Sequence, residues 1–225
     1  MGVSSSAVNQ RYNRTNSDLL PNNMKRNIHG IFCLEGDWWN DFNRASTVKP
    51  ILKLLSQGVG LSVPFIHRDV GTREELVYYL RRWRQASGKR YPILYLAFHG
   101  GPNCLYVGDQ RRSDAVVKLD ELAEMLGSGL SGRAVHFGSC GTMKTDRRNI
   151  QRFLKATGLE AATGFKSDIE WLQSSVFDVL FFEAFLRYAI TRKGVSSVNQ
   201  VISTEHRHMK RALEFRMEIR DRQKR

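Results

Sequence analysis

The sequence predicts an α/β protein with a doubly wound, mostly parallel sheet, and three observations support this prediction. Short apolar runs alternate along the chain with amphipathic helical stretches. The run Tyr91–Phe98 (YPILYLAF) is apolar on both faces, which is typical of a central parallel strand that helices cover on both sides. Hydrophobic side chains make up 41% of the 225 residues, which is enough for a packed core. Strands that alternate with helices favour one α/β domain over two.

The first part of the chain contains a polar lead-in and two predicted strands. Residues 1–27 are rich in Asn, Ser and Arg, and we expect them to form a mobile or irregular N-terminal arm. Ile28–Leu34 and Pro64–Val70 have the composition of short buried strands. Ser46 or Thr47 can cap a helix between these two strands, because a hydroxyl at this position accepts a hydrogen bond from the first helical turn.

A capping box opens the next predicted helix. Thr72 stands three residues before Glu75, so that the hydroxyl and the carboxylate can each accept a bond from an unpaired backbone N–H. The helix then places Leu76, Leu80 and Trp83 on one face. This spacing predicts an amphipathic helix packed on the sheet.

The second half of the chain continues the alternation and ends in a basic stretch. The predicted elements are a strand at Cys104–Val107, a helix at Leu119–Leu126, a strand at Ala134–Phe137, a helix at Arg148–Leu154, a strand at Glu160–Phe165 and an apolar helix at Ser174–Ala189. From Ser196 onward, the spacing of Met209, Leu213 and Met217 predicts a basic amphipathic helix that runs toward the C-terminus. Residues 28–225 are therefore predicted to form a single domain.

Charge and composition limit the possible functions. Lys and Arg number 35 against 22 Asp and Glu, which gives a net charge of +13 and favours acidic partners, including nucleic acid. No zinc finger, RNP box or Gly-rich loop accompanies this charge. No apolar run approaches the roughly 20 residues of a membrane span. The three cysteines are too few for a disulfide framework, and the N-terminus has no apolar signal region, so we expect a cytoplasmic protein without a membrane span.

Two central strands end on reactive side chains, each followed by glycine. One leads to His99 and Gly100, and the other leads to Cys140 and Gly141. The carboxyl ends of parallel strands meet at one edge of the sheet, so we expect the imidazole and the thiol to share a crevice. This pair predicts cysteine catalysis, with Cys140 as nucleophile, His99 as acid and base, and the N–H groups of Gly100 and Cys140 as oxyanion donors. An imidazolium neighbour or a local dipole is expected to lower the pKa of the thiol.

Other candidates for chemistry carry weaker signals. Cys104 is close to His99 in the sequence and could compete as nucleophile, although Cys140 has the better glycine context. His67 and His136 lie inside strand-like runs, where we expect them to be packed or hydrogen bonded. Three scattered cysteines do not give the paired spacing of a zinc site, so we expect no metal and no cofactor.

The two blocks together resemble a known group of enzymes. ILYLAFHG (Ile93–Gly100) followed by AVHFGSCG (Ala134–Gly141) is similar to the caspase-like cysteine peptidases of the CHAT type, in clan CD. The resemblance extends over roughly Ile28 to Ile202. It implies a caspase–haemoglobinase-like three-layer α/β/α sandwich, a dyad of His99 and Cys140, and hydrolysis of peptide bonds in a protein substrate.

Several departures from these relatives bear on specificity and control. Gly138 and Ser139 precede the cysteine, where caspases have Gln-Ala, so cleavage after Asp is not implied. Relatives that cut after Arg or Lys line the first subsite with an acid. Asp168 and Glu170 fall where such a residue could lie, and both could equally be surface acids. The chain lacks the sensor modules often fused to CHAT domains, so we expect a regulatory or activating protein partner.

Two functions of other classes remain open. The chain could be an interaction module on the same scaffold, with an inactive dyad and a basic surface that recruits an acidic partner. It could also be a basic nucleic-acid-binding regulator, in which case its affinity would fall steeply with salt.

Overall fold

A six-stranded sheet forms the middle of the molecule in the computed structural model, which describes residues 29–39, 43, 46–57, 63–85 and 90–222. The strands are β1 (Ile31–Glu35), β2 (Phe65–Asp69), β3 (Ile93–Ala97), β7 (Ala134–Phe137), β8 (Ala161–Phe165) and β9 (Phe215–Ile219). Their order is β2-β1-β3-β7-β8-β9. All neighbouring pairs are parallel except β8 and β9.

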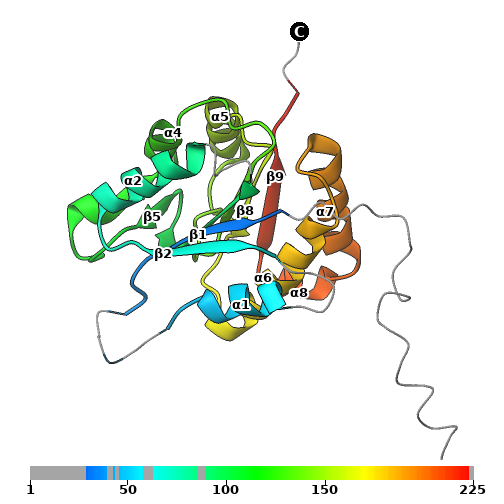
Figure 1. Ribbon diagram of the computed structural model, residues 1–225, viewed down its shortest axis with the longest axis horizontal. Coiled ribbons are helices and arrows are strands. Elements are labelled where there is room, and N and C mark those ends of the chain that lie inside the picture. Colours follow the sequence, from blue (N-terminus) through cyan, green and yellow to red (C-terminus); the bar gives the residue numbers. More distant parts are fainter. Residues whose placement is uncertain (1–28, 40–42, 44–45, 58–62, 86–89, 223–225) are drawn as a thin grey trace, which may run out of the picture.

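Helices cover both faces of this sheet (Figure 1). One layer consists of α2 (Arg73–Arg84), α4 (Leu119–Leu126) and α5 (Arg147–Thr157), and the other consists of α1 (Lys49–Gln57), α6 (Trp171–Leu186), α7 (Arg192–Thr204) and α8 (Arg207–Ala212). Successive side chains of a strand point to opposite faces, so Leu94 and Leu96 pack toward the first layer while Ile93 and Tyr95 pack toward the second. The predicted three-layer α/β/α sandwich with a mostly parallel sheet is confirmed.

Local signals set most of the helix starts. The Thr72 hydroxyl accepts from the Glu75 N–H, and the Glu75 carboxylate accepts from the Thr72 N–H, which completes the predicted capping box of α2. Asp146 caps α5 by accepting from the Arg148 N–H. Gly158 ends α5 with a φ of 82°, a backbone conformation that costs glycine little.

The C-terminal region differs from its prediction. The prediction of one basic helix from Ser196 toward the C-terminus is wrong. The segment is divided at Glu205 and His206 into α7 and α8, and beyond Ala212 the chain passes through Glu214, which has a φ of 46°, and continues as β9. The Phe215 ring lies 4.7 Å from the ring of Phe177 and 5.1 Å from that of Phe181. This aromatic contact and the pairing with β8 outweigh the helical spacing of the segment.

A second, smaller sheet was only partly expected. It joins β4 (His99–Gly101), β5 (Cys104–Tyr106) and β6 (Val116–Lys118), which pair antiparallel in that order. The predicted strand at Cys104–Val107 corresponds to β5, while β4 and β6 had no strand signal of their own. The small sheet begins directly after β3, and therefore holds His99 at the carboxyl edge of the central sheet.

The predicted N-terminal arm, residues 1–27, lies outside the described residues. Among the helices that the structure describes, none has the length and apolar character needed to cross a bilayer.

Candidate active site

The segments that carry His99 and Cys140 leave the sheet side by side. Strands β3 and β7 are parallel neighbours, with Leu96 opposite Phe137. His99 begins β4 shortly after β3 ends, and Cys140 lies in the turn that follows β7. The sheet order therefore brings both residues to the same carboxyl edge, as the sequence predicted.

Glycine allows the two segments to touch. A methyl group added to Gly100 would lie 2.3 Å from Thr142 Oγ1, 2.7 Å from the Cys140 carbonyl oxygen and 2.9 Å from Ser139 Cβ. Gly141 has a φ of 67°, and a methyl group added there would be in ordinary van der Waals contact with the Gly101 backbone, 3.6 Å from its Cα. The backbone after His99 thus lies in direct contact with the backbone around Cys140, and any side chain at Gly100 would force the two apart.

The His99 ring is held by Trp38, which lies in the loop after β1. His99 Nε2 lies 2.7 Å from the Trp38 carbonyl oxygen, which can only accept, so Nε2 donates the hydrogen bond. The rings of Trp38 and His99 meet edge to face with centroids 5.4 Å apart. A neutral imidazole with its proton on Nε2 keeps a lone pair on Nδ1, which can then accept a proton.

Cys140 is half-buried, and its environment differs from the expected one. Burial raises the pKa of the thiol, the Asp168 carboxylate raises it further, and a hydrogen bond from the Ile169 N–H lowers it in part. The expected lowering of the thiol pKa is therefore wrong for this state of the protein. Desolvation and a nearby like charge both disfavour the thiolate, and together they outweigh the single N–H donor.

The two expected oxyanion donors are the N–H groups of Gly100 and Cys140, which lie on either side of the contact between Gly100 and the turn that holds Cys140. Gly100 belongs to β4, opposite Leu105. Within the described part of the chain, the Cys140 backbone N–H has no hydrogen-bond acceptor. An N–H of this kind next to the sulfur is suited to donate to a substrate oxygen.

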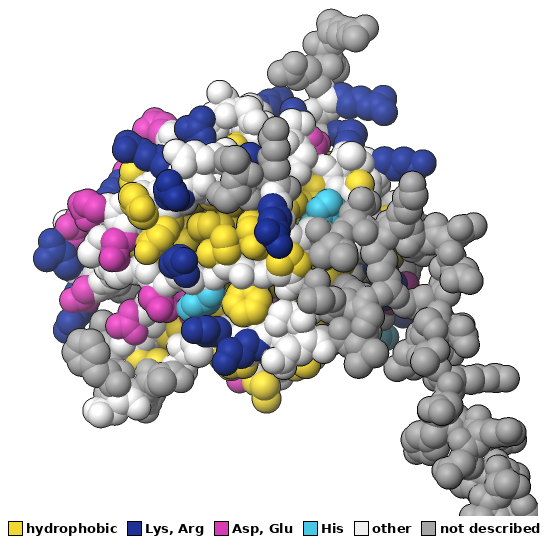
Figure 2. Space-filling view, viewed as in Figure 1, with side chains coloured by type: hydrophobic (Ala, Val, Ile, Leu, Met, Phe, Trp, Pro, Cys, Tyr) yellow, Lys and Arg dark blue, Asp and Glu magenta, His cyan; other side chains and the backbone are white. Residues whose placement is uncertain are grey.

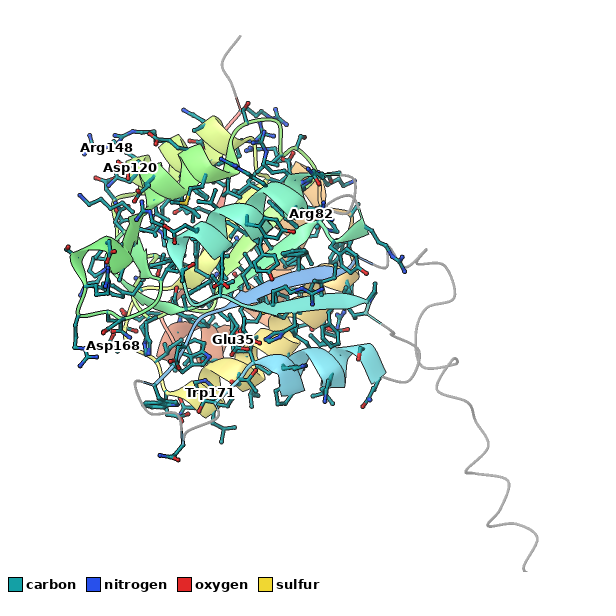
Figure 3. All side chains as sticks on the ribbon, turned by 60° about the vertical axis from the view of Figure 1, so that its left-hand side comes forward. Glu35, Arg82, Asp120, Arg148, Asp168 and Trp171 are labelled. Carbon is teal, nitrogen blue, oxygen red and sulfur yellow. The ribbon has the colours of Figure 1, made fainter. Side chains whose placement is uncertain are left out.

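The two predicted substrate-binding acids occupy different environments after β8. Asp168 is exposed and close enough to Cys140 for its charge to act on the thiol. Glu170 accepts from the Gln173 N–H at 2.8 Å and caps α6. Figure 3 shows Asp168 and Trp171 in the same lower part of the view as Glu35. The structure thus brings Asp168 to the candidate site and gives Glu170 a separate role as a helix cap.

The remaining predicted residues have structural contacts. Cys104 is buried, and its carbonyl accepts from the Thr142 hydroxyl. His136 is 1% exposed and lies between Thr163 Oγ1, at 2.9 Å, and Asp178 Oδ1, at 3.0 Å. His67 Nε2 lies 2.5 Å from a Glu35 oxygen. Both histidines are hydrogen bonded, as the sequence predicted.

Sequence reasoning missed Glu35, a 2% exposed carboxylate at the end of β1. In the described part of the chain, Glu35, His67 and Asp69 are the one group whose possible ligand atoms lie within 4.8 Å of one another. The Glu35 oxygens already accept four hydrogen bonds, which use its lone pairs. The only signal in the sequence was a charged residue that closes an otherwise apolar strand.

The face shown in Figure 2 carries its positive charge at scattered positions. Lys and Arg side chains are scattered over the whole face shown in Figure 2, and hydrophobic side chains occupy its centre. Several arginines are paired with acids, such as Arg147 with Asp221 at 2.7 Å and Arg187 with Glu183 at 2.7 Å. This face therefore has no continuous basic stripe of the kind that follows a nucleic-acid backbone.

Exposure predicts the order in which the cysteines react. We expect iodoacetamide to modify Cys140 well before Cys33 or Cys104, because Cys140 is half-buried whereas the other two are buried. Burial also raises the pKa of the Cys33 thiol far above its usual value. Peptide mapping by mass spectrometry after short exposure measures the order. Equal modification of all three cysteines under native conditions would contradict this arrangement.

Comparison with known proteins identifies a family and a distant likeness to solved structures. Residues 28–218 match the model of a family described as a family of unknown function (DUF6642). Among solved structures, caspase-1 from Spodoptera frugiperda is similar over 81% of this chain and 80% of that chain, with 14% sequence identity and a TM-score of 0.43. No curated protein matches the sequence. At this identity, the likeness to caspase-1 transfers no residue's role to this chain.

Proposed function

We propose that this chain, which belongs to the DUF6642 family of unknown function, is a cysteine endopeptidase of the caspase-like, CHAT type. It would use His99 and Cys140 as a dyad to hydrolyse peptide bonds in a protein substrate. The observation that supports this proposal most is the contact of Gly100 with the Ser139–Thr142 turn. A catalytic dyad needs its two side chains on backbones fixed against each other.

The proposed reaction follows the usual course of thiol catalysis. The Cys140 sulfur attacks the peptide carbonyl carbon as its proton passes to His99 Nδ1. His99 then protonates the leaving amine, so that the C–N bond breaks and a thioester remains on Cys140. Water attacks the thioester with His99 as base, which releases the acid and restores the thiol. The Trp38 carbonyl supports this series of steps because it keeps one proton on His99 Nε2. Nδ1 can then accept and release the proton that is transferred in the reaction.

The developing oxyanion needs donors close to the sulfur. We assign this role to the N–H groups of Gly100 and Cys140. Their neighbouring backbones are in contact, so both donors would be fixed before substrate binds. Such donors contribute most when they need no rearrangement during the reaction.

Asp168 is the basis for a proposed substrate preference. An acid near the nucleophile favours a basic residue before the scissile bond, since opposite charges attract. The same acid raises the pKa of the Cys140 thiol in the free protein. A bound Arg or Lys would offset the charge of Asp168 and so remove this contribution to the raised thiol pKa. A regulatory protein partner that covers this segment would control both effects.

We expect Asp168→Asn to change two measurements in opposite directions. Cleavage after Arg or Lys should fall by about ten- to a hundredfold in kcat/KM, because the charge partner is lost. The rate of Cys140 alkylation should rise at neutral pH, because removing a negative charge lowers the pKa of the thiol. Initial rates on matched peptides and a pH series with iodoacetamide measure the two effects.

Glu170→Gln distinguishes the two predicted acids. The glutamine oxygen can still accept from the Gln173 N–H and cap α6, so we expect the preference for a basic residue to be kept. A loss of that preference in Glu170→Gln and not in Asp168→Asn would assign the subsite to Glu170 instead.

An unbiased cleavage-site profile tests the proposed activity. The purified protein is incubated with a proteome-derived peptide library, and new termini are compared with those from Cys140→Ala. Termini that depend on Cys140 and follow Arg or Lys are the expected result. The same termini from both proteins would refute Cys140 as the nucleophile. If neither protein produces new termini, the interaction module with an inactive dyad is favoured, in agreement with the raised thiol pKa.

A further inference from the structure

Glu35 is the most heavily hydrogen-bonded carboxylate near the candidate site. Its Oε1 accepts from Trp38 Nε1 at 2.6 Å and from the Val48 N–H at 2.7 Å. Its Oε2 accepts from the Thr47 hydroxyl at 2.6 Å and lies 2.5 Å from His67 Nε2. Glu35 itself is 2% exposed, so the four contacts replace water around a buried carboxylate.

These contacts keep the carboxylate charged. Burial alone would raise the pKa of Glu35, but the hydrogen bonds from His67, Thr47, Trp38 and Val48 lower it below its usual value. Hydrogen bonds to an ionised acceptor are shorter and stronger than those between neutral groups. Glu35 therefore provides a fixed anchor at the end of β1, a strand that pairs with β2 on one side and β3 on the other.

Trp38 connects this anchor to His99. Its indole N–H donates to Glu35, while its carbonyl oxygen accepts from His99 Nε2 at 2.7 Å. The ring of Trp38 also meets the His99 ring edge to face, 5.4 Å between centroids. Trp38 lies in the loop after β1, outside any helix or strand, so ladder hydrogen bonds do not fix its carbonyl.

We propose that Glu35 is a positioning residue for His99 and acts through Trp38. The inference rests on the proposed peptidase function, and it deepens the account of the same site. Glu35 accepts a hydrogen bond from the Trp38 indole, and this bond fixes the loop after β1. The fixed loop directs the Trp38 carbonyl oxygen toward His99 Nε2. This chain of contacts selects the His99 tautomer with a free Nδ1 and fixes the ring orientation, as partners of a functional histidine commonly do.

Trp38→Phe is the test, since it removes the indole N–H and keeps an aromatic ring. We expect kcat to fall by about tenfold, because the base loses its fixed orientation, while KM changes by less than twofold. Trp39→Phe is the matched control. The Trp39 indole N–H donates to Ser46 Oγ at 2.8 Å, a partner outside the series of contacts from Glu35 through Trp38 to His99, so we expect kcat within twofold of the parent. The substrate is the fluorogenic peptide cut fastest in the cleavage profile.

The tautomer of His99 can be measured without substrate, so this measurement tests the positioning role of Glu35 independently of the proposed peptidase function. ¹⁵N NMR of the histidine rings, recorded at a pH where imidazole is neutral, is expected to show the His99 proton on Nε2 in the parent and in Trp39→Phe. In Trp38→Phe we expect a mixture of both tautomers. If the parent cleaves no peptide, the tautomer still tests the positioning role. An unchanged tautomer together with an unchanged kcat in Trp38→Phe would overturn the inference and leave the peptidase proposal intact.

Variants of Glu35 complete the test. Glu35→Gln keeps an oxygen that can accept from Trp38 Nε1 and the Val48 N–H, so we expect the parent's His99 tautomer and a kcat within about threefold. Glu35→Ala removes the anchor, and we expect the same tautomer mixture as in Trp38→Phe. If Glu35→Ala does not fold, Trp38→Phe and Glu35→Gln decide the question. A parent-like tautomer in a folded Glu35→Ala would overturn the inference.

Discussion

Replacing Cys140 by alanine is expected to lower the rate of peptide cleavage by at least about a thousandfold. The substitution removes the sulfur that would form the thioester. Losses of this size are typical when the nucleophile of a covalent mechanism is removed. Initial rates on the best peptide from the cleavage profile measure the effect.

The fold should survive this change. Cys140 is half-buried and lies in a turn outside the two apolar layers, so we expect the free energy of unfolding to change by no more than about 1 kcal/mol. Cys104→Ala is the control at a second cysteine close to His99 in the chain. Loss of cleavage in Cys104→Ala with normal cleavage in Cys140→Ala would assign the nucleophile to Cys104.

Replacing Asp178 by alanine is expected to destabilise the protein by about 3 kcal/mol. Asp178 is 2% exposed on α6. It accepts from the Tyr95 hydroxyl at 2.7 Å and lies 3.0 Å from His136 Nε2. Removing the carboxylate leaves two buried polar groups without a partner, and each such group costs about 1–3 kcal/mol. Urea denaturation followed by circular dichroism measures the change.

A conservative variant separates hydrogen bonding from charge at this position. Asp178→Asn keeps one oxygen acceptor and the shape of the side chain, so we expect a smaller loss than in Asp178→Ala. A loss below about 1 kcal/mol in Asp178→Ala would mean that the buried network does not hold α6 on the sheet.

Local patterns were sufficient to predict most of the fold. The apolar run around β3, the Thr72 capping box and the amphipathic spacing of α4 each act through near neighbours in the chain. Strand β9 could not be predicted in this way, because its residues also fit a helix. It forms because Phe215 enters an aromatic cluster and Arg216 donates to the carbonyls of Met143 and Thr145, partners about seventy residues away.

The candidate site was likewise only partly predictable from local patterns in the sequence. His99 and Cys140 were found because each follows an apolar strand and precedes a glycine. The direction of the thiol pKa was predicted wrongly, because the burial of Cys140, which is the main cause of the rise, and the nearby Asp168 charge both depend on how distant segments pack around the turn after β7. Glu35 was missed because three of its partners, Thr47, Val48 and His67, come from other segments.

The hydrogen bond from the Ile169 N–H to the Cys140 sulfur has a consequence for protein engineering. The residue that donates it sits beside Asp168, so one stretch of backbone would serve both substrate choice and sulfur chemistry. Replacing the segment after β8 to obtain a new substrate preference would also change the reactivity of the Cys140 thiol. Selectivity and reactivity are then expected to evolve together in this scaffold, and a designer would need to screen for both traits at once.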